Sequence, residues 1–175
     1  MKQPVMLALA ALAAALLVLS GDNAASAQVV SLCIGNGHVN GRIITGTPFG
    51  DFIDCSASSG DLVIFGLGGN DWIVAGRGSD VIDGGPGDDI LIGRDSKDFL
   101  RGGPGNDFLA GGRGDDLLRG EAGTDQLFGG DDNDLLFGGA DNDIMFGGTG
   151  LDLCDGQDGN NDLASTSCEK PANVP

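Results

Sequence analysis

The 175-residue chain contains one histidine, no tyrosine and, among its 26 acidic residues, only two glutamates, Glu121 and Glu169. With His38 as the sole histidine, no Ser-His-Asp or Cys-His arrangement can be built near the aspartates, which argues against nucleophilic catalysis. The four cysteines form no CxxC motif, so zinc or redox chemistry is not expected of them. The aspartates also recur regularly, whereas a glycosidase or aspartic-protease site requires one singular pair. We therefore expect that the protein is not an enzyme.

Basic residues are scarce as well, because only nine lysines and arginines oppose the acids and leave a formal charge of −17. Such a charge disfavours nucleic acid and anionic membrane surfaces as partners. Aromatic residues make up only 5% of the chain, and an acidic composition with few aromatics often accompanies disorder. Aliphatic residues nevertheless recur at fixed positions, and this regularity predicts conditional order.

The first 27 residues have the pattern of a secretory signal peptide. Lys2 supplies a positive charge, residues 5–19 are apolar, and Ala25-Ser26-Ala27 matches an A-x-A cleavage site. The apolar run is short for a membrane span, and no later segment is apolar enough to cross a bilayer. We expect cleavage after Ala27 and a soluble, secreted, extracellular protein. An uncleaved anchor is the alternative.

Aspartates recur at unbroken nine-residue intervals between residues 71 and 152. A short fixed period is typical of a stacked repeat fold, in which each unit contacts its neighbours. The ten aspartates in this phase are Asp71, Asp80, Asp89, Asp98, Asp107, Asp116, Asp125, Asp134, Asp143 and Asp152.

The most complete units begin with a glycine-rich turn. Residues 84–92, 102–110 and 111–119 read GGPGDDILI, GGPGNDFLA and GGRGDDLLR, and residues 147–152 open a fourth unit with GGTGLD. These units match G-G-x-G-x-D-x-U-x, where U is a large apolar residue, so the chain resembles the repeats-in-toxin (RTX), or haemolysin-type, calcium-binding repeat family. The resemblance covers about two-thirds of the chain after residue 27.

The resemblance implies an all-β fold, a right-handed parallel β-roll (β-solenoid) in which two units make one turn and each row lies above the row two units later. It also implies that several Ca²⁺ ions bind between the stacked turns, held by the ten aspartates and by turn glycines. The glycines of the most complete turns, which permit positive φ, are Gly85, Gly87, Gly103, Gly105, Gly112, Gly114, Gly148 and Gly150.

Each unit is expected to contain a six-residue turn and a three-residue strand whose middle residue faces the core. The residue after each aspartate then faces outward, yet it is mostly apolar, and Phe128, Phe137 and Phe146 add aromatic side chains nearby. These apolar residues either reflect the ordinary preference of such residues for strands on a solvated sheet or form a contact surface for a protein partner or self-association. The expected core residues are Ile64, Ile73, Ile82, Leu91, Leu100, Leu109, Leu118, Leu127, Leu136, Met145 and Cys154.

Calcium binding and folding are expected to be coupled. Like charges on rows about 4.8 Å apart repel by about 3.5 kcal/mol at an effective dielectric of 20, so stacked aspartates oppose folding without a cation. The thin core does not offset a chain-ordering cost on the order of 1–2 kcal/mol per residue, which leaves a role for metal binding. Turn 93–98 carries Arg94, Ser96 and Lys97 in place of glycines or neutral residues, so weak binding is expected beside Asp98.

The four cysteines flank the repeats in two pairs, which suits an oxidising compartment. Of the three possible connectivities we favour the nearest-neighbour one, Cys33 with Cys55 and Cys154 with Cys168, in which each bridge closes a cap over one end of the stack.

These observations divide the chain into a signal peptide (1–27), an N-terminal cap with degenerate repeats (28–56), an RTX-type β-roll (57–155) and a C-terminal cap and tail (156–175). The predicted function is Ca²⁺ binding at several sites by a secreted protein with a structural or adhesive extracellular role. The alternative is the orphan repeat module of a secreted enzyme or toxin system, which substrate turnover or an effector neighbour would favour.

Overall fold

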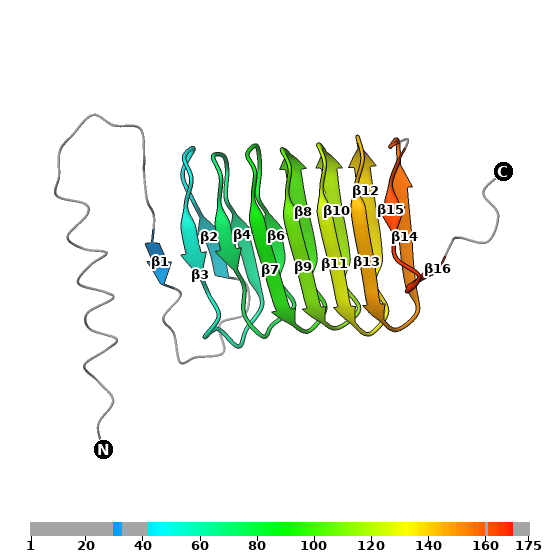
Figure 1. Ribbon diagram of the computed structural model, residues 1–175. Coiled ribbons are helices and arrows are strands. Elements are labelled where there is room, and N and C mark those ends of the chain that lie inside the picture. The colour runs from blue at the N-terminus through cyan, green and yellow to red at the C-terminus, as the bar shows by residue number, and fades with distance from the viewer. Residues whose placement is uncertain (1–29, 33–41, 160, 170–175) are drawn as a thin grey trace, which may run out of the picture.

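The computed structural model describes residues 30–32, 42–159 and 161–169, which form two parallel sheets of eight strands each, stacked along the length of the molecule (Figure 1). The odd sheet contains β1 (Val30–Leu32), β3 (Phe52–Asp54), β5 (Trp72–Val74), β7 (Ile90–Asp95), β9 (Phe108–Arg113), β11 (Gln126–Asp131), β13 (Ile144–Thr149) and β15 (Leu163–Ala164). The even sheet contains β2 (Arg42–Thr45), β4 (Leu62–Phe65), β6 (Val81–Asp83), β8 (Phe99–Pro104), β10 (Leu117–Ala122), β12 (Leu135–Ala140), β14 (Asp152–Gln157) and β16 (Cys168–Glu169). The described residues include no helix that is long and apolar enough to cross a membrane.

Each strand pairs with the strand two units later in the chain, which is the connectivity of a β-roll. Leu91 pairs with Leu109 in the odd sheet and Leu118 pairs with Leu136 in the even sheet, so the register advances by two units per rung. The predicted all-β parallel β-roll, with each row above the row two units later, is therefore confirmed. Its right-handed sense stays a prediction.

Most strands are longer than the three residues predicted. Strands β3, β5 and β6 have three residues, whereas β7 to β14 have six each. The strands are longer because pairing continues into the stacked turns. After Arg119 pairs with Phe137, the pairing passes over one residue and resumes between Glu121 and Gly139. The residue passed over is the first glycine of a turn, so the turns belong to the same hydrogen-bonded ladders as the strands.

Two stacked rows of apolar side chains, one from each sheet, fill the space between the two sheets. All eleven predicted core residues, from Ile64 to Cys154, are buried, and Ile44 and Ile53 extend the two rows toward the N-terminus. Burial of such a side chain contributes about 1.5–3 kcal/mol. A slip of one residue would turn every core side chain outward, so these side chains also fix the register of the strands.

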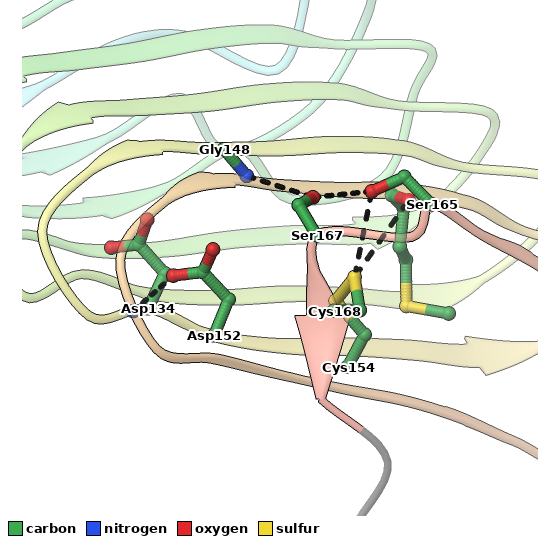
Figure 2. Close-up of a disulfide and its surroundings, with 8 residues drawn as sticks. Asp134, Gly148, Asp152, Cys154, Ser165, Ser167 and Cys168 are labelled. Atoms are coloured by element: carbon green, nitrogen blue, oxygen red, sulfur yellow. Dashed lines mark hydrogen bonds between the residues drawn. A yellow bond between two sulfur atoms is a disulfide. The ribbon is translucent and has the colours of Figure 1, made fainter.

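A disulfide bond closes the C-terminal end of the stack. Cys154 in β14 is bonded to Cys168 in β16, with Cα atoms 5.5 Å apart, which confirms the predicted pair. Figure 2 shows Cys168 beside Ser165 and Ser167, and the Ser167 hydroxyl accepts a hydrogen bond from the Gly148 N–H at 3.1 Å. Strands β15 and β16 thus continue the two sheets beyond residue 155.

The N-terminal rows also continue the sheets, because β2 and β3 pair in register with β4 and β5. Cys55, which follows β3, is buried and disulfide-bonded. Its predicted partner Cys33 lies outside the described residues. The predicted domain limits, including the signal peptide, stay predictions.

Candidate metal centre

The turns of the roll form two edges. Turns that lead into the odd sheet make up edge A and comprise residues 66–71, 84–89, 102–107, 120–125 and 138–143. Turns that lead into the even sheet make up edge B and comprise residues 75–80, 93–98, 111–116, 129–134 and 147–152. Every one of these turns ends in one of the ten predicted aspartates, which therefore stand in two columns, one on each edge.

Hydrogen bonds join the aspartates within each column. On edge A the N–H of Asp89 donates to Oδ1 of Asp107 at 2.8 Å, and the N–H of Asp107 donates to Oδ1 of Asp125 at 2.7 Å. On edge B the N–H of Asp98 donates to Oδ1 of Asp116 at 2.7 Å. Each carboxylate thus uses one oxygen to hold the backbone of the preceding row, and all ten aspartates are buried.

The second carboxylate oxygen has no hydrogen-bond donor in nine of the ten aspartates. Leaving a buried polar group unsatisfied costs about 1–3 kcal/mol, and more when the group is charged. A repeated set of such oxygens therefore points to a ligand that they bind together. The oxygens are the Oδ2 atoms of Asp71, Asp89, Asp107, Asp125 and Asp143 on edge A and of Asp98, Asp116, Asp134 and Asp152 on edge B.

In nine of the ten turns the first residue is a glycine, which makes room for this oxygen. A Cβ placed on Gly66 would overlap Oδ2 of Asp71 and would lie 2.5 Å from the carbonyl oxygen of Gly84 in the next row. The equivalent Cβ on Gly111 would overlap Oδ2 of Asp116. A small space bordered by a carboxylate oxygen of one row and a carbonyl oxygen of the next row is therefore repeated along the edges.

In nine of the ten turns the second and fourth positions have a left-handed backbone; Gly76 and Gly78 of turn 75–80 do not. All eight glycines assigned to the calcium turns have positive φ, from 98° at Gly85 to 150° at Gly105. Where the sequence departs from the pattern, the backbone keeps this conformation: φ is 95° at Arg94, 78° at Ser96 and 80° at Asp132. A non-glycine residue held there costs on the order of 1–3 kcal/mol. The irregular turns therefore retain the geometry of the regular ones at some expense of stability.

Burial raises the pKa of nine aspartates in the two columns, those from Asp71 to Asp143 in the nine-residue phase. The pKa rises to about 6 at Asp107 and Asp116, to about 7 at Asp89 and to about 8 at Asp98, chiefly because the carboxylates lose water. Hydrogen bonds from the backbone lower these pKa values, and neighbouring carboxylates raise them; at Asp98 the neighbours include Asp80. Without a counter-ion, part of each column therefore binds protons near neutral pH, and a cation competes with those protons.

Two aspartates differ because donors satisfy both of their oxygens. Asp80 accepts the Leu62 N–H at Oδ1 (2.8 Å) and the Gly76 N–H at Oδ2 (2.9 Å). Asp51, one row before edge A, accepts both the N–H and the hydroxyl of Thr47. The predicted metal ligand Asp80 thus lacks the unsatisfied oxygen that the other nine predicted ligands have.

The sequence analysis missed one member of the edge A column. Asp162 accepts the Asp143 N–H at Oδ1 (3.0 Å) and so occupies the aspartate position of the following row. An inserted residue moves Asp162 one place out of the nine-residue phase. The signal that could have identified it is Gly156, where a Cβ would overlap the Asp162 carboxylate as in the regular turns.

The third turn position distinguishes the two edges. On edge B it holds alternating charges, and ion pairs of 3.8 Å join neighbouring rows. These pairs are largely exposed, so each contributes at most about 1 kcal/mol. The charged residues of edge B are Arg77, Asp95, Arg113 and Asp131, whereas the equivalent residues of edge A include Pro86, Pro104, Ala122 and Ala140.

The donor atoms on the edges are all oxygens. Within the part of the chain that the structure describes, no group of three or more His, Cys, Asp or Glu side chains is placed to hold a metal ion. A cation would therefore depend on one or two aspartate oxygens together with backbone carbonyl oxygens of the turns. Such a set suits Ca²⁺, which accepts six to eight oxygens in flexible geometry, better than Mg²⁺, which demands a stricter octahedron. The unsatisfied Oδ2 atoms and the carbonyl oxygens beside them thus fit Ca²⁺, and a parallel β-roll with these columns defines a calcium-binding repeat protein.

The comparison with protein families agrees with this class. The model of the RTX calcium-binding nonapeptide repeat matches four overlapping copies, at residues 65–100, 92–127, 101–136 and 128–163. Together the copies span more than half of the chain, so the chain belongs to the RTX calcium-binding nonapeptide repeat family. No curated protein matches the chain.

Proposed function

We propose that this protein is secreted, binds several Ca²⁺ ions along both edges of its β-roll, and has a structural or adhesive role outside the cell. The observation that carries the proposal is the set of nine buried carboxylate oxygens without hydrogen-bond donors. When bound, Ca²⁺ neutralises neighbouring carboxylates and links one row to the next. The aspartates supply the negative charge, the first glycine of each turn leaves space for it, and the left-handed glycines shape the turn.

Folding of the roll depends on these ions in our proposal. Ten carboxylates are buried in two columns, and burial together with like-charge repulsion disfavours their ionised form. Most strands contribute only one apolar side chain to the core, which limits what burial alone contributes. Cation binding is then part of the free energy of folding, as in other metal-dependent domains.

Export is supported by the signal-like pattern of residues 1–27 and by the disulfide chemistry of Cys55, Cys154 and Cys168. Disulfide bonds form and persist in oxidising compartments outside the cytosol. We propose further that the protein is not an enzyme, because its carboxylates repeat as columns and its single histidine offers no catalytic arrangement with them.

The outward face of the odd sheet is the proposed contact surface for a protein partner or a second copy. In the first three residues of strands β5 to β13 of this sheet the outward side chains are uncharged, and Phe128 lies 5.1 Å from both Phe108 and Phe146, measured between ring centroids. The even sheet instead places Arg101 and Arg119 in register on its outer face. Uncharged apolar surface of this kind is typical of interaction sites, which supports an adhesive role for the odd sheet.

Calorimetric titration of the secreted protein tests the proposed function. We expect several Ca²⁺ ions per chain, release of all of them by a chelator, and much weaker binding of Mg²⁺. Binding of no Ca²⁺, or equal binding of Ca²⁺ and Mg²⁺, would contradict the proposal.

A further inference from the structure

The outward side of strands β5 to β13 in the odd sheet, which we call the odd face, is apolar. These strands lie side by side along the stack (Figure 1), so their outward side chains form one continuous surface, on which Trp72, Ile90 and Phe146 are exposed. The even sheet carries charges on its outer face, and burying them in a contact would cost free energy. Those charged residues are Asp83, Arg101, Arg119 and Asp155.

A ladder of alternating charge borders the odd face on the side of edge B. Asp95, Arg113 and Asp131 are the last residues of β7, β9 and β11, and Arg77 stands at the same turn position one row earlier. Neighbouring members approach to 3.8 Å between charged atoms, and all four side chains are exposed enough to meet a partner. The ladder thus reads Arg, Asp, Arg, Asp along the stack, with one charge in each row.

This order is complementary to its own reverse. A two-fold axis that runs parallel to the strands and passes between β7 and β9 lays the odd face of a second copy on the first. Asp95 then faces Arg113 of the second copy and Arg77 faces its Asp131, and the two-fold repeats both pairs. With the axis moved onto β9, Arg113 would face itself and Asp95 would face Asp131. The ladder therefore permits one register and opposes the adjacent one.

The apolar side chains suit the same register. Ile90 and Ile92 of β7 lie level with Phe108 and Ala110 of β9, so the two-fold sets Ile92 against Ala110, the smallest outward side chain of the face. A two-fold along the stack would instead lay the ladder over the third turn position of edge A. That position holds uncharged residues, among them Pro86, Pro104, Ala122 and Ala140.

We propose that the odd face binds a second copy of this chain, in a two-fold dimer whose register is set by the ladder of Arg77, Asp95, Arg113 and Asp131. The proposal identifies the partner of the contact surface and rests on the proposed function, because the roll that carries the ladder forms with Ca²⁺. Bound Ca²⁺ also reduces the formal charge of −17, which makes two copies repel.

The size of the face sets the strength of the dimer. Rows about 4.8 Å apart and strands that rise about 3.3 Å per residue give a face of roughly 25 by 20 Å. Two such faces bury on the order of 1,000 Å², which is at the lower limit for a specific interface, so the dimer is reversible. Exposed ion pairs add little affinity but select orientation and register.

Sedimentation equilibrium in saturating Ca²⁺, over a range of protein concentrations, tests the dimer. The unaltered protein should show a reversible monomer–dimer equilibrium. Ile90→Lys, beside the two-fold, should weaken association by about tenfold or more because it buries a charge. Leu135→Lys is the matched control, since Leu135 also begins a six-residue strand and is 42% exposed against 37% for Ile90, but on the even sheet. It should change association by less than about twofold.

Charge reversal tests the register. Asp95→Arg and Arg113→Asp each set like charges against each other across the two-fold, so each variant alone should associate more weakly than the unaltered protein. An equal mixture of the two should form a heterodimer, because the reversed positions then meet opposite charges. The double variant Asp95→Arg/Arg113→Asp should dimerise again, although it loses two of the three ion pairs of the ladder within each chain.

The outcomes separate this inference from the proposed function, because calorimetric titration of the same samples shows whether Ca²⁺ binds. A calcium-bound protein that stays monomeric at every concentration would overturn the inference and leave calcium binding intact. Equal losses in Ile90→Lys and Leu135→Lys, or a mixture of the charge variants that stays monomeric, would also overturn it. If Ile90→Lys fails to fold by circular dichroism, the exposed charge variants decide.

Discussion

Edges A and B are built from the same nine-residue repeat but stabilise their carboxylate columns differently. Edge A has five unsatisfied aspartates and uncharged residues at its third turn position. Edge B has four, begins with a turn in which backbone N–H groups satisfy both oxygens of Asp80, and carries a ladder of Arg–Asp ion pairs. In our proposal edge A relies more on bound cations, whereas edge B has arginine side chains of the protein itself at its third turn position.

Changing pH without calcium should have the largest effect on both edges. Burial raises the pKa of Asp71 from 3.8 to about 6, that of Asp89 to about 7 and that of Asp98 to about 8. The protonated form is favoured in the fold, so this stabilising contribution is complete below about pH 4 and is lost as the pH rises through 6 to 8. Far-ultraviolet circular dichroism of chelator-treated protein should therefore show more β structure at pH 5 than at pH 8. A signal independent of pH would contradict the protonation of the columns.

Opening the C-terminal disulfide should affect edge A more than edge B. The Cys154–Cys168 bridge closes a loop of 14 residues that contains Asp162, the last carboxylate of edge A. Cys168→Ser should lower the free energy of unfolding by about 3 kcal/mol in the chain-entropy model. It should also expose the backbone near Asp143 to hydrogen exchange and promote association in calcium, because an uncapped sheet end invites pairing between molecules.

The control for the disulfide variant is the central part of the stack. Calcium binding by the turns around Asp107 should be mostly unchanged in Cys168→Ser, as judged by calorimetric titration. Loss of all binding, or the absence of any association by light scattering, would show that the bridge does not act as a local cap.

Single carboxylates on the two edges should differ in their effect on calcium. Asp107 lies in a complete turn of edge A, whereas Asp98 shares its turn with Arg94 and Lys97, and the charge of Lys97 lowers the pKa of Asp116 in the next row. Asp107→Ala should weaken calcium binding by roughly tenfold, or about 1.4 kcal/mol, and Asp98→Ala by less. Equal effects in calorimetric titration would remove the distinction between the edges.

Backbone strain offers a smaller test on edge A. Leu67 is half exposed and has a φ of 84° at the second position of turn 66–71, where regular turns have glycine. Leu67→Gly should raise the free energy of unfolding by about 1 kcal/mol because the strained conformation suits glycine. Leu151→Gly is the matched control on edge B, since Leu151 is an exposed turn leucine without positive φ, and it should be destabilising. Thermal unfolding in saturating calcium measures the stability of both variants. A loss of stability in Leu67→Gly would contradict the claim that the backbone at Leu67 is strained.

The ion-pair ladder of edge B should give the smallest effect. Asp95 lies 3.8 Å from both Arg77 and Arg113, and all three side chains are largely exposed. Asp95→Asn should lower stability by about 0.5 kcal/mol at low salt and by less at high salt. Asp88→Asn on edge A removes the same charge while keeping the oxygen that accepts the Asn106 N–H, so it should be neutral or slightly stabilising. Identical results for the two variants would mean that the ladder contributes nothing.

Much of this architecture could be predicted from the sequence because one nine-residue repeat sets the spacing of the turns, the strands and the core residues. The nine-residue phase of the aspartates placed them in two stacked columns, and the residue two places after each aspartate, such as Leu91 or Leu118, correctly identified the core. The six-residue strands were missed because they arise from hydrogen bonds between stacked turns, which no single unit reveals. Asp162 was missed because an insertion breaks the phase.

The division of roles between carboxylate oxygens could not be read from the sequence either. Repulsion between stacked aspartates was expected, yet Oδ1 of each binds the backbone of the preceding row, and only Oδ2 is left for a ligand. The exception at Asp80 goes with the conformation of its turn: Oδ2 accepts the Gly76 N–H, and Gly76 and Gly78 lack the positive φ found at the same positions of the other turns. Such effects depend on packing between rows rather than on the pattern within one row.

Far-ultraviolet circular dichroism during calcium titration tests the central claim, that buried aspartate columns require Ca²⁺ to form the roll. At neutral pH the chelator-treated protein should be largely disordered, and millimolar Ca²⁺ should restore β structure while equal Mg²⁺ has little effect. A full β signal in excess chelator at neutral pH, unchanged by Ca²⁺, would contradict the account.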